Sequence, residues 1–447
     1  MKFKPHTSQA TSLVAKAFGL FGSVQLFTML FSVIRTKLVA VWIGPVGVGL
    51  FGVFNTALDM VSSVTQLSMR TSAVKEIAQE HTDTPTIART VRWWALILGI
   101  AGTVLCAGGA PLLSIWTFGD TSHTWNFIVL SLSLLFTSLT GGESALLQGR
   151  KLLKDLARAS VWGNLFGLAV SVPLYYFFRV DSIVWSITVY SLAAFLAFFA
   201  LRYKVTVNIG SSNWHEAYAR GKGFIRLGIY LTISSFALYL GYYIFMSYLM
   251  AKSGAEEVGY YQAGFTIINK YAGIIFTVMG MEFYPRLAAV AGHPLRESAF
   301  VNHECRILLI ALIPIVIAFL CFRTVIIDLL YASGFEVITG YLTWGILGTL
   351  FRAVSWCMSY VMVVRGDSLV YLLVELSSVA IYLVANVLCY NCWGLTGLGY
   401  AYVAWYLLYT IIAGAVYRFR YHLHISYKVT LTLATGLLLS VALIAII

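Results

Sequence analysis

Long apolar runs, separated by short polar or charged stretches, follow one another from residue 14 to the end of the chain. A helix needs about 20 predominantly apolar residues to cross a bilayer, and strong charges and Gly/Pro turns divide the runs into thirteen candidates. They are expected near residues 14–41, 46–68, 93–117, 124–148, 158–178, 182–201, 224–251, 256–284, 306–328, 337–364, 368–389, 395–417 and 428–447. The pattern predicts an all-α integral membrane protein with about 13 transmembrane helices.

The composition supports this class. Hydrophobic residues make up 60% of the chain and charged residues only 11%, and the mean hydropathy is +0.83. These values exclude a water-soluble globular protein. The first apolar run holds Arg35 and Lys37 and lacks a small-residue cleavage site, so we interpret it as a retained helix rather than a signal peptide.

The basic residues are distributed unevenly between the two sides of the predicted bundle. The N-terminal segment and the even-numbered connections hold 23 of the 30 lysines and arginines, and loop cations concentrate on the cytoplasmic side of a membrane. We therefore expect a cytoplasmic N-terminus. The net charge of +12 follows from this asymmetry, which predicts contact with membrane lipids and gives no reason to expect a nucleic-acid partner.

The chain repeats a short pattern after the first and after the seventh predicted helix, and the residue numbers of the two copies differ by 210. We expect the first glycine of each copy to supply backbone freedom in a tight turn. The matched pairs are Gly44 and Gly254, Gly49 and Gly259, Phe51 and Tyr261, and Asp59 and Asn269.

The repeat predicts two parallel six-helix bundles, since an even number of helices returns each half to the side on which it began. Transporters built in this way enclose a central cavity near the midplane and expose it alternately. The expected divisions are an N-terminal lobe at 1–205, a cytoplasmic linker at 206–223, a C-terminal lobe at 224–418 and one extra transmembrane helix at 419–447.

Four cations interrupt the predicted helices: Arg35, Lys37, Lys270 and Arg352. A charge inside a membrane costs several kcal/mol by most estimates and marks a functional site by default. Lys270 and Arg352 fall near the midplane, whereas Arg35 and Lys37 point about 200° apart on one helix, so that at most one faces the cavity centre. An excess of cations predicts an anionic, phosphate-bearing cargo.

Three carboxylates also fall inside predicted helices: Asp59, Glu143 and Glu375. We expect Asp59 to compensate Lys270 when the cavity is empty, and Glu143 and Glu375 to be candidates for proton or sodium coupling. A structural ion pair that pins two helices is the alternative for each buried charge.

Enzymatic chemistry and bound cofactors are not expected. The sequence lacks a phosphate-binding G-x-x-x-x-G-K-[ST] loop, an H-E-x-x-H pair and a G-x-S-x-G elbow. Cys389 and Cys392 form a C-x-x-C pair with no histidine nearby, so we interpret them as small packing residues and expect no metal site.

The stretch from Arg35 to Gly49 (RTKLVAVWIGPVGVG) resembles the first-helix signature of polysaccharide flippases of the Wzx type, the O-antigen and enterobacterial common antigen lipid translocases. They belong to the MOP superfamily, with the MATE exporters and lipid II flippases. Further similarity lies at Val258–Gln262, Pro285–Leu287, Arg352 and Glu375. The resemblance extends over residues 10 to 418 and implies a MATE-like fold; the extra last helix departs from it.

By this resemblance Lys37 matches a lysine of the common-antigen flippase, and Arg35 an arginine that lipid II flippases place in their cavity. The acidic residue that some members carry in the eighth helix has no match near Lys270. The resemblance implies a flippase that moves an undecaprenyl-pyrophosphate-linked oligosaccharide across a bacterial cytoplasmic membrane, for O-antigen or another surface polysaccharide, with other polysaccharide assembly proteins as further partners.

On this hypothesis Arg35, Lys270 and Arg352 hold the pyrophosphate, and Lys37 either belongs to the same pyrophosphate and glycan cavity or serves the end of its helix. Two alternatives remain. An ion-coupled, MATE-like exporter of drugs or metabolites shares the fold. A membrane glycan polymerase or ligase is disfavoured, because such enzymes carry a large outer loop and the predicted outer loops here are short.

Overall fold

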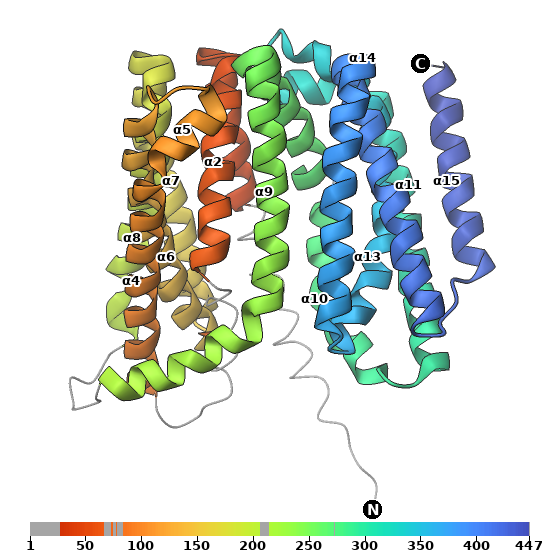
Figure 1. Cartoon of the computed structure of the whole chain (residues 1–447), viewed down its shortest axis with the longest axis horizontal. Coiled ribbons are helices and arrows are strands. Elements are labelled where there is room, and N and C mark those ends of the chain that lie inside the picture. The colour runs from red at the N-terminus through yellow and green to blue at the C-terminus, as the bar shows by residue number, and fades with distance from the viewer. Residues whose placement is uncertain are drawn as a thin grey trace, which may run out of the picture. The chain divides into compact units, whose positions relative to one another are not determined.

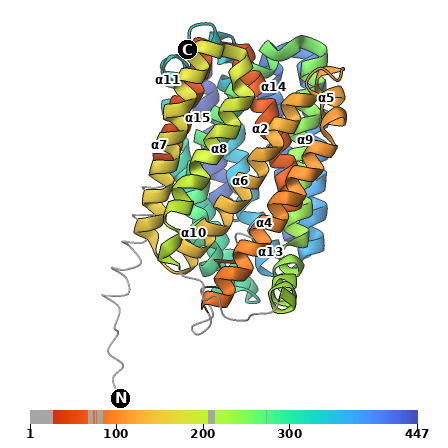
Figure 2. The same ribbon diagram turned by 90° about the vertical axis from the view of Figure 1, so that its left-hand side faces the viewer.

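The computed structural model describes residues 27–66, 73–74, 77, 84–205, 214–271 and 273–446. Every regular element within these ranges is a helix (Figures 1 and 2). The predicted all-α class is confirmed. The first half of the first predicted helix and part of the predicted linker lie outside the described residues.

The chain divides into two compact units. Unit 1 comprises Met1–Ile43 with Phe54–Thr232, and unit 2 comprises Gly44–Val53 with Ile233–Ile447. The helix α2 (Pro45–Thr65) contributes its first turns to unit 2 and the remainder to unit 1. The predicted division into two lobes, a linker and an extra helix stays a prediction in its detailed boundaries.

Unit 1 is organised around one central helix. A helical segment at 27–42 precedes α2, and α6 contacts α4, α5, α7 and α8. The helices of this unit after α2 are α4 (Thr84–Gly108), α5 (Ala110–Phe118), α6 (Thr124–Gly149), α7 (Leu153–Phe178) and α8 (Ser182–Ala200), with short 3-10 turns at η1 (Arg179–Asp181) and η2 (Arg202–Lys204).

Small residues bring these helices together. A Cβ at Gly163 would lie 3.0 Å from the Cα of Ala194, so α7 and α8 meet almost backbone to backbone. Between α4 and α6, the Ser138 hydroxyl donates a hydrogen bond of 2.7 Å to the carbonyl of Ala95. Close packing and such hydrogen bonds replace the hydrophobic effect as the driving force between helices in lipid.

Unit 2 contains longer and less regular helices. Its helices are α9 (Trp214–Thr266, whose first residues belong to unit 1), the π-helical turn η3 (Ile267–Tyr271), α10 (Ile274–Val290), α11 (Pro294–Leu330), the 3-10 turn η4 (Phe335–Ile338), α12 (Thr339–Gly345), α13 (Gly348–Val364), α14 (Ser368–Phe419) and α15 (Tyr427–Ile446). Helix α15, the predicted extra helix, packs on α11 and α13 (Figure 1).

Residues with positive φ lie at matching places in the two copies of the repeat. Gly44 and Gly254 both have φ of +84°, as the predicted tight turns require. Three further pairs of positive-φ residues also match, with numbers that differ by 215: Gly119 and Gly334, Lys151 and Gly366, and Arg179 and Gly394. The structure thus confirms the repeat at the glycine turns and extends it, with the offset growing from 210 to 215.

The helix boundaries follow the same two offsets. The first residues of α4 and α11 differ in number by 210, whereas those of α6 and α12 differ by 215, and so do those of α7 and α14. The five additional residues of the second copy therefore lie between the start of α11 and Gly334.

The second glycine of each repeat serves a different purpose from the first. Within unit 2, a Cβ at Gly49 would overlap the carbonyl oxygen of Ala255, and a Cβ at Gly259 would overlap that of Pro45. Pro45 and Ala255 are themselves a matched pair of the repeat, so the contact is reciprocal. Both glycines are needed for close approach of two helices.

Eight described helices are long and apolar enough to cross a membrane, or nine if the bent pair at Phe335–Val364 is one span. Two of them turn at a non-helical glycine, Gly254 in α9 and Gly394 in α14. At about 1.5 Å per residue, the 52 residues of α14 exceed twice the ~30 Å of a hydrocarbon core, which fits two spans joined at Gly394. The count of thirteen stays a prediction.

Candidate functional site

Arg35 and Asp59 line one cavity of about 250 Å³ inside unit 1. Arg35 lies on the 27–42 segment and Asp59 on α2. The Arg35 guanidinium carbon is 4.2 Å from the centre of the Tyr190 ring, and the Tyr190 hydroxyl donates a hydrogen bond of 2.5 Å to Asn164 Oδ1. The remaining wall is mostly small or polar, from α2, α6 and α8. The cavity therefore combines a cation, a carboxylate and an aromatic face.

Lys37 lies on the same segment as Arg35 and is partly buried. It is not among the residues that line the Arg35 cavity. The structure thus separates the two neighbouring cations, as their spacing along a helix predicts.

Arg352 is the centre of a polar and aromatic cluster inside unit 2. Its Nη1 donates hydrogen bonds to Asn269 Oδ1 at 3.0 Å and to the Tyr402 hydroxyl at 3.4 Å. The Tyr402 hydroxyl also donates to Asn269 Oδ1, at 3.1 Å. The guanidinium carbon lies 4.7 Å from the Phe276 ring centre and 5.6 Å from that of Tyr406.

All of these described partners of Arg352 are neutral. An amide, hydroxyls and aromatic faces hold the guanidinium group in place without cancelling its charge. A partly buried cation held in this way is electrostatically prepared for an anion.

The backbone is irregular at two places beside this cluster. Asn269 and Lys270 lie in the π-helical turn η3, and Arg352 follows the break between α12 and α13, where the pair bends by 50°. Such π-helical turns and broken membrane helices occur frequently at functional and substrate sites. The backbone of Lys270 is thus beside the cluster, while its side chain lies outside the described part of the structure.

Glu375 on α14 lies in a second polar group of unit 2. Its Oε1 accepts a hydrogen bond of 2.5 Å from the Tyr409 hydroxyl, and that hydroxyl is 2.8 Å from Ser359 Oγ. Glu375 therefore lies in a small hydrogen-bonded network with two hydroxyl groups.

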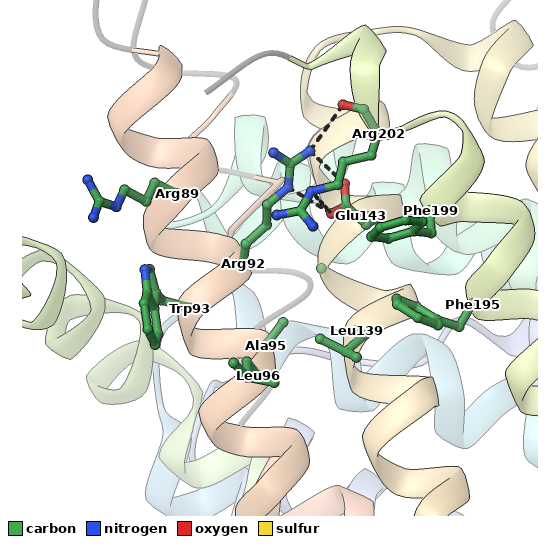
Figure 3. Close-up of a pocket in the computed structure, with 11 residues that line it drawn as sticks. Arg89, Arg92, Trp93, Ala95, Leu96, Leu139, Glu143, Phe195, Phe199 and Arg202 are labelled. Atoms are coloured by element: carbon green, nitrogen blue, oxygen red, sulfur yellow. Dashed lines mark hydrogen bonds and ion pairs between the residues drawn. The ribbon is translucent and has the colours of Figure 1, made fainter. Parts of the chain in front are cut away.

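Glu143 forms a bidentate ion pair. Arg92 Nε donates to Glu143 Oε1 at 2.7 Å and Nη2 donates to Oε2 at 2.9 Å, which ties α4 to α6 (Figure 3). Unit 2 has a similar pair, in which Arg365 Nε and Nη2 donate to the two oxygens of the fully buried Glu297, at 3.1 and 2.6 Å. For Glu143 this geometry favours the structural alternative, because both carboxylate oxygens are engaged.

The structure thus brings together some of the predicted residues and adds partners that the sequence did not indicate. Arg35 and Asp59 share a cavity, whereas the predicted compensation of Lys270 by Asp59 stays a prediction. The aromatic partners of Arg352 were missed because sequence alone does not distinguish cavity tyrosines from the many interfacial ones. Arg92 falls just before the helix predicted at 93–117, whereas the structure places it within α4, where it binds a carboxylate 51 residues away.

Comparison with known proteins places the chain in a family. A family model described as "Polysaccharide biosynthesis protein" matches residues 43–339. The chain belongs to this family. It is also similar to the lipid III flippase of Escherichia coli (strain K12), with 21% identity over 394 residues that cover 85% of this chain and 92% of the relative. The lipid III flippase of Shigella flexneri matches to the same extent.

Solved structures share the fold. An inward-facing multidrug resistance MATE family transporter of the MOP superfamily aligns with a TM-score of 0.67 at 14% identity, covering 91% of this chain and 98% of the transporter. The lipid II flippase MurJ, in an inward closed conformation, aligns with a TM-score of 0.64 at 13% identity, covering 95% and 92%. The predicted MATE-like membrane fold and the resemblance to MOP-superfamily polysaccharide flippases are confirmed; the O-antigen assignment stays a prediction.

Proposed function

We propose that this protein is a flippase that moves an undecaprenyl-pyrophosphate-linked oligosaccharide from the cytoplasmic to the periplasmic leaflet by alternating access. The observation that carries the proposal is Arg352, a cation in a membrane helix whose described partners are all neutral. The family, and the similarity to proteins named lipid III flippase, support the substrate class.

The chemistry of a pyrophosphate suits this arrangement. Arginine offers five N–H donors in a fixed fork that matches phosphate oxygens. Both described hydrogen bonds of Arg352 use Nη1, so in this proposal Nε and Nη2 bind the phosphate, while the rings of Phe276 and Tyr406 hold the guanidinium plane. Charge-assisted bonds of this kind are roughly twice as strong as neutral ones.

The other predicted residues take supporting roles. Lys270, next to Asn269 in the chain, adds a second positive charge near the pyrophosphate. Arg35 contributes a cation from unit 1, with Asp59 as its compensating carboxylate in the shared cavity. Lys37 either stabilises the end of its helix or contacts the glycan.

The two buried glutamates are assigned different tasks. Glu143 balances Arg92, and Glu375 is the candidate for proton or sodium coupling because a hydroxyl network surrounds it. The proposed location is the bacterial inner membrane, with a cytoplasmic N-terminus. The glycan is destined for a surface polysaccharide such as O-antigen, and other assembly proteins are the expected partners.

A transport assay in proteoliposomes tests this function. Proteoliposomes loaded with lipid-linked oligosaccharide are assayed for its exposure to an external glycosidase, with the wild type, Arg352→Ala, Lys270→Ala and Arg296→Ala. Arg296 is exposed at the start of α11 and is the matched control. We expect Arg352→Ala and Lys270→Ala each to lower the rate at least about tenfold, as loss of a charge-assisted contact predicts.

Full export by both variants contradicts the cationic site. Binding of cationic drugs by the wild type without a response to lipid-linked glycan would instead identify a drug exporter, the alternative with the same fold.

A further inference from the structure

A second and larger cavity, of about 660 Å³, lies inside unit 1 between α4, α6 and α8 (Figure 3). It shares no lining residue with the cavity of Arg35. The proposed transport function makes no use of it, and its lining has two distinct parts, one basic and one apolar.

The basic part contains three arginines against one glutamate. Arg92 is committed to the structure, because it binds both oxygens of Glu143 and its Nη2 also donates to the carbonyls of Arg202 and Val205, at 3.3 and 3.2 Å. The ion pair leaves Glu143 neutralised. Arg89 and Arg202 therefore provide the excess positive charge of the cavity.

Arg202 is the better placed of these two. The ion-paired Arg92 fixes its backbone carbonyl, and its Nε lies 3.7 Å from Glu143 Oε1. Its side chain is nevertheless 46% exposed, so the guanidinium group reaches the cavity and its opening. Arg89 lies across α4 from Arg92 and adds charge at the opposite margin (Figure 3).

The apolar part consists of side chains that a lipid chain contacts well. Leu96, Leu139 and Phe195 line the interior, while Trp93 and Phe199 are 44% and 46% exposed at its margins. Exposed apolar side chains at the margin of a cavity are suited to contact an acyl chain. The Arg202 guanidinium carbon lies 5.5 Å from the Phe199 ring centre, so the basic and apolar parts join at this pair.

We propose that this cavity binds an anionic phospholipid. The headgroup phosphate binds Arg202, with Arg89 strengthening the local field, and an acyl chain lies along Phe199, Phe195 and Leu139. Basic pockets between membrane helices with adjoining apolar surface bind anionic headgroups, and Arg–phosphate contacts are charge-assisted. A free phosphate ion would leave the apolar wall without a ligand, which is why we assign a lipid. The proposal does not depend on the transported substrate.

The amount of phospholipid retained by the purified protein tests this proposal directly. The full-length protein is reconstituted in nanodiscs of equal parts phosphatidylcholine and phosphatidylglycerol, released into mild detergent and analysed by native mass spectrometry for bound phosphatidylglycerol. The test variant is Arg89→Gln combined with Arg202→Gln. The matched control is Arg158→Gln, which removes an arginine of the same unit that is 69% exposed and lines neither cavity.

We expect the wild type and the control to retain phosphatidylglycerol in preference to phosphatidylcholine, and the double variant to retain about tenfold less. Inorganic phosphate added before release should not displace the lipid. Equal retention by all three proteins overturns the proposal, and an equal loss in the Arg158→Gln control does so too. Full displacement by inorganic phosphate shows a simple anion site and overturns the lipid assignment.

A second measurement keeps the test valid if the double variant does not fold. Wild-type protein is irradiated with phosphatidylglycerol that carries a photoreactive group in its acyl chain, and the adducts are mapped by peptide sequencing. Adducts concentrated on α6 and α8 around Leu139 and Phe199 support the site. Adducts spread evenly over the lipid-facing helices contradict it, and a site occupied only by the lipid-linked oligosaccharide would show no phosphatidylglycerol adducts there.

Discussion

The cavity around Arg35 in unit 1 and the cluster around Arg352 in unit 2 share matched positions of the duplicated chain, yet they carry side chains of different size. Adding 215 to the numbers of four residues that line the unit 1 cavity gives residues of the polar groups around Arg352 and Glu375 in unit 2. The converted pairs are Thr137 and Arg352, Ile187 and Tyr402, Ser191 and Tyr406, and Ala194 and Tyr409. The unit 1 residues are smaller than their counterparts, which are Arg352, two tyrosines of its cluster and Tyr409, the partner of Glu375.

The charges of the two copies differ as well. In unit 1 Arg35 shares its cavity with a carboxylate, Asp59. The residue of unit 2 that matches Asp59 is an amide, Asn269, and Arg352 binds it. Asp59 and Asn269 have nearly the same shape but differ in charge. Arg35 therefore shares its cavity with a carboxylate, whereas the described partners of Arg352 are neutral. On the proposed function, this difference favours Arg352 over Arg35 as the main contact of the substrate's negative charge.

The backbone also differs between the two units at these matched positions. The matching segment of α2, around Asp59, is regular α-helix, whereas Asn269 lies in a π-helical turn. Helix α6 is continuous, whereas its counterpart is broken between α12 and α13. Irregular backbone leaves polar groups that must be satisfied inside a membrane protein, so it is tolerated only where it is buried in protein or lines a cavity.

The largest expected effect comes from the ion pairs that tie helices in each unit. Glu297→Ala should destabilise the protein by about 3–5 kcal/mol, because it leaves the Arg365 charge without its buried partner. Glu143→Ala should cost less, since Arg92 retains two carbonyl acceptors. Thermal unfolding in detergent measures both, and a larger loss for Glu143→Ala would contradict this ranking.

A charge exchange controls for this prediction. The exchanged pair keeps opposite charges on α4 and α6, whereas each single change places two like charges together. The double variant Arg92→Glu with Glu143→Arg should therefore be more stable than either single change. Additive losses would show that the pair itself contributes little.

Filling the unit 1 cavity tests whether its openness matters. Ser191→Tyr introduces the residue found at the matching position of unit 2, and should lower transport severalfold while the protein folds, because a phenol group occupies much of a 250 Å³ space. Ser191→Thr is the matched control and should transport normally. Unchanged transport by Ser191→Tyr would show that this cavity is not on the substrate path.

The smallest effect is a dependence on pH that belongs to unit 2. The hydrogen bond from Arg420 lowers the pKa of Asp367, in the turn before α14. The matching residues of unit 1, Leu152 and Val205, are apolar. A carboxyl group with a lowered pKa contributes stability above its unfolded pKa of about 3.9 and loses that contribution as the pH falls through the folded value.

Unfolding temperatures between pH 6 and the acid range check this prediction. Wild-type stability should exceed that of Asp367→Asn at pH 6 by a small margin, since the pair is on the surface, and the margin should shrink as the pH falls below about 4. A margin that grows on acidification would contradict the assignment.

Much of the fold was predictable because long apolar runs and glycine turns are local signals. Gly44 and Gly254 have the positive φ that their turns required, and Gly394 lies in the predicted break of α14. The reason for Gly49 and Gly259 could not be predicted, because it depends on where α2 and α9 cross in the folded protein.

The site was predictable only in part. Arg35 and Arg352 could be identified from sequence, because a charged residue in an apolar run has a high free-energy cost in a membrane. Their partners come from other helices: Tyr402 follows Arg352 by 50 residues, and Tyr190 lies on α8, whereas Arg35 lies on the 27–42 segment. The change of offset from 210 to 215 also concealed the match between Thr137 and Arg352.

Binding of undecaprenyl pyrophosphate to purified wild type, Asn269→Asp and Asp59→Asn tests the central claim most directly. If the neutral Asn269 leaves the charge of Arg352 available to the ligand, a carboxylate at position 269 should compete with the pyrophosphate for Arg352. Asn269→Asp should then weaken binding by about tenfold or more. Asp59→Asn should bind at least as tightly as the wild type. Unchanged affinity of Asn269→Asp would contradict the account.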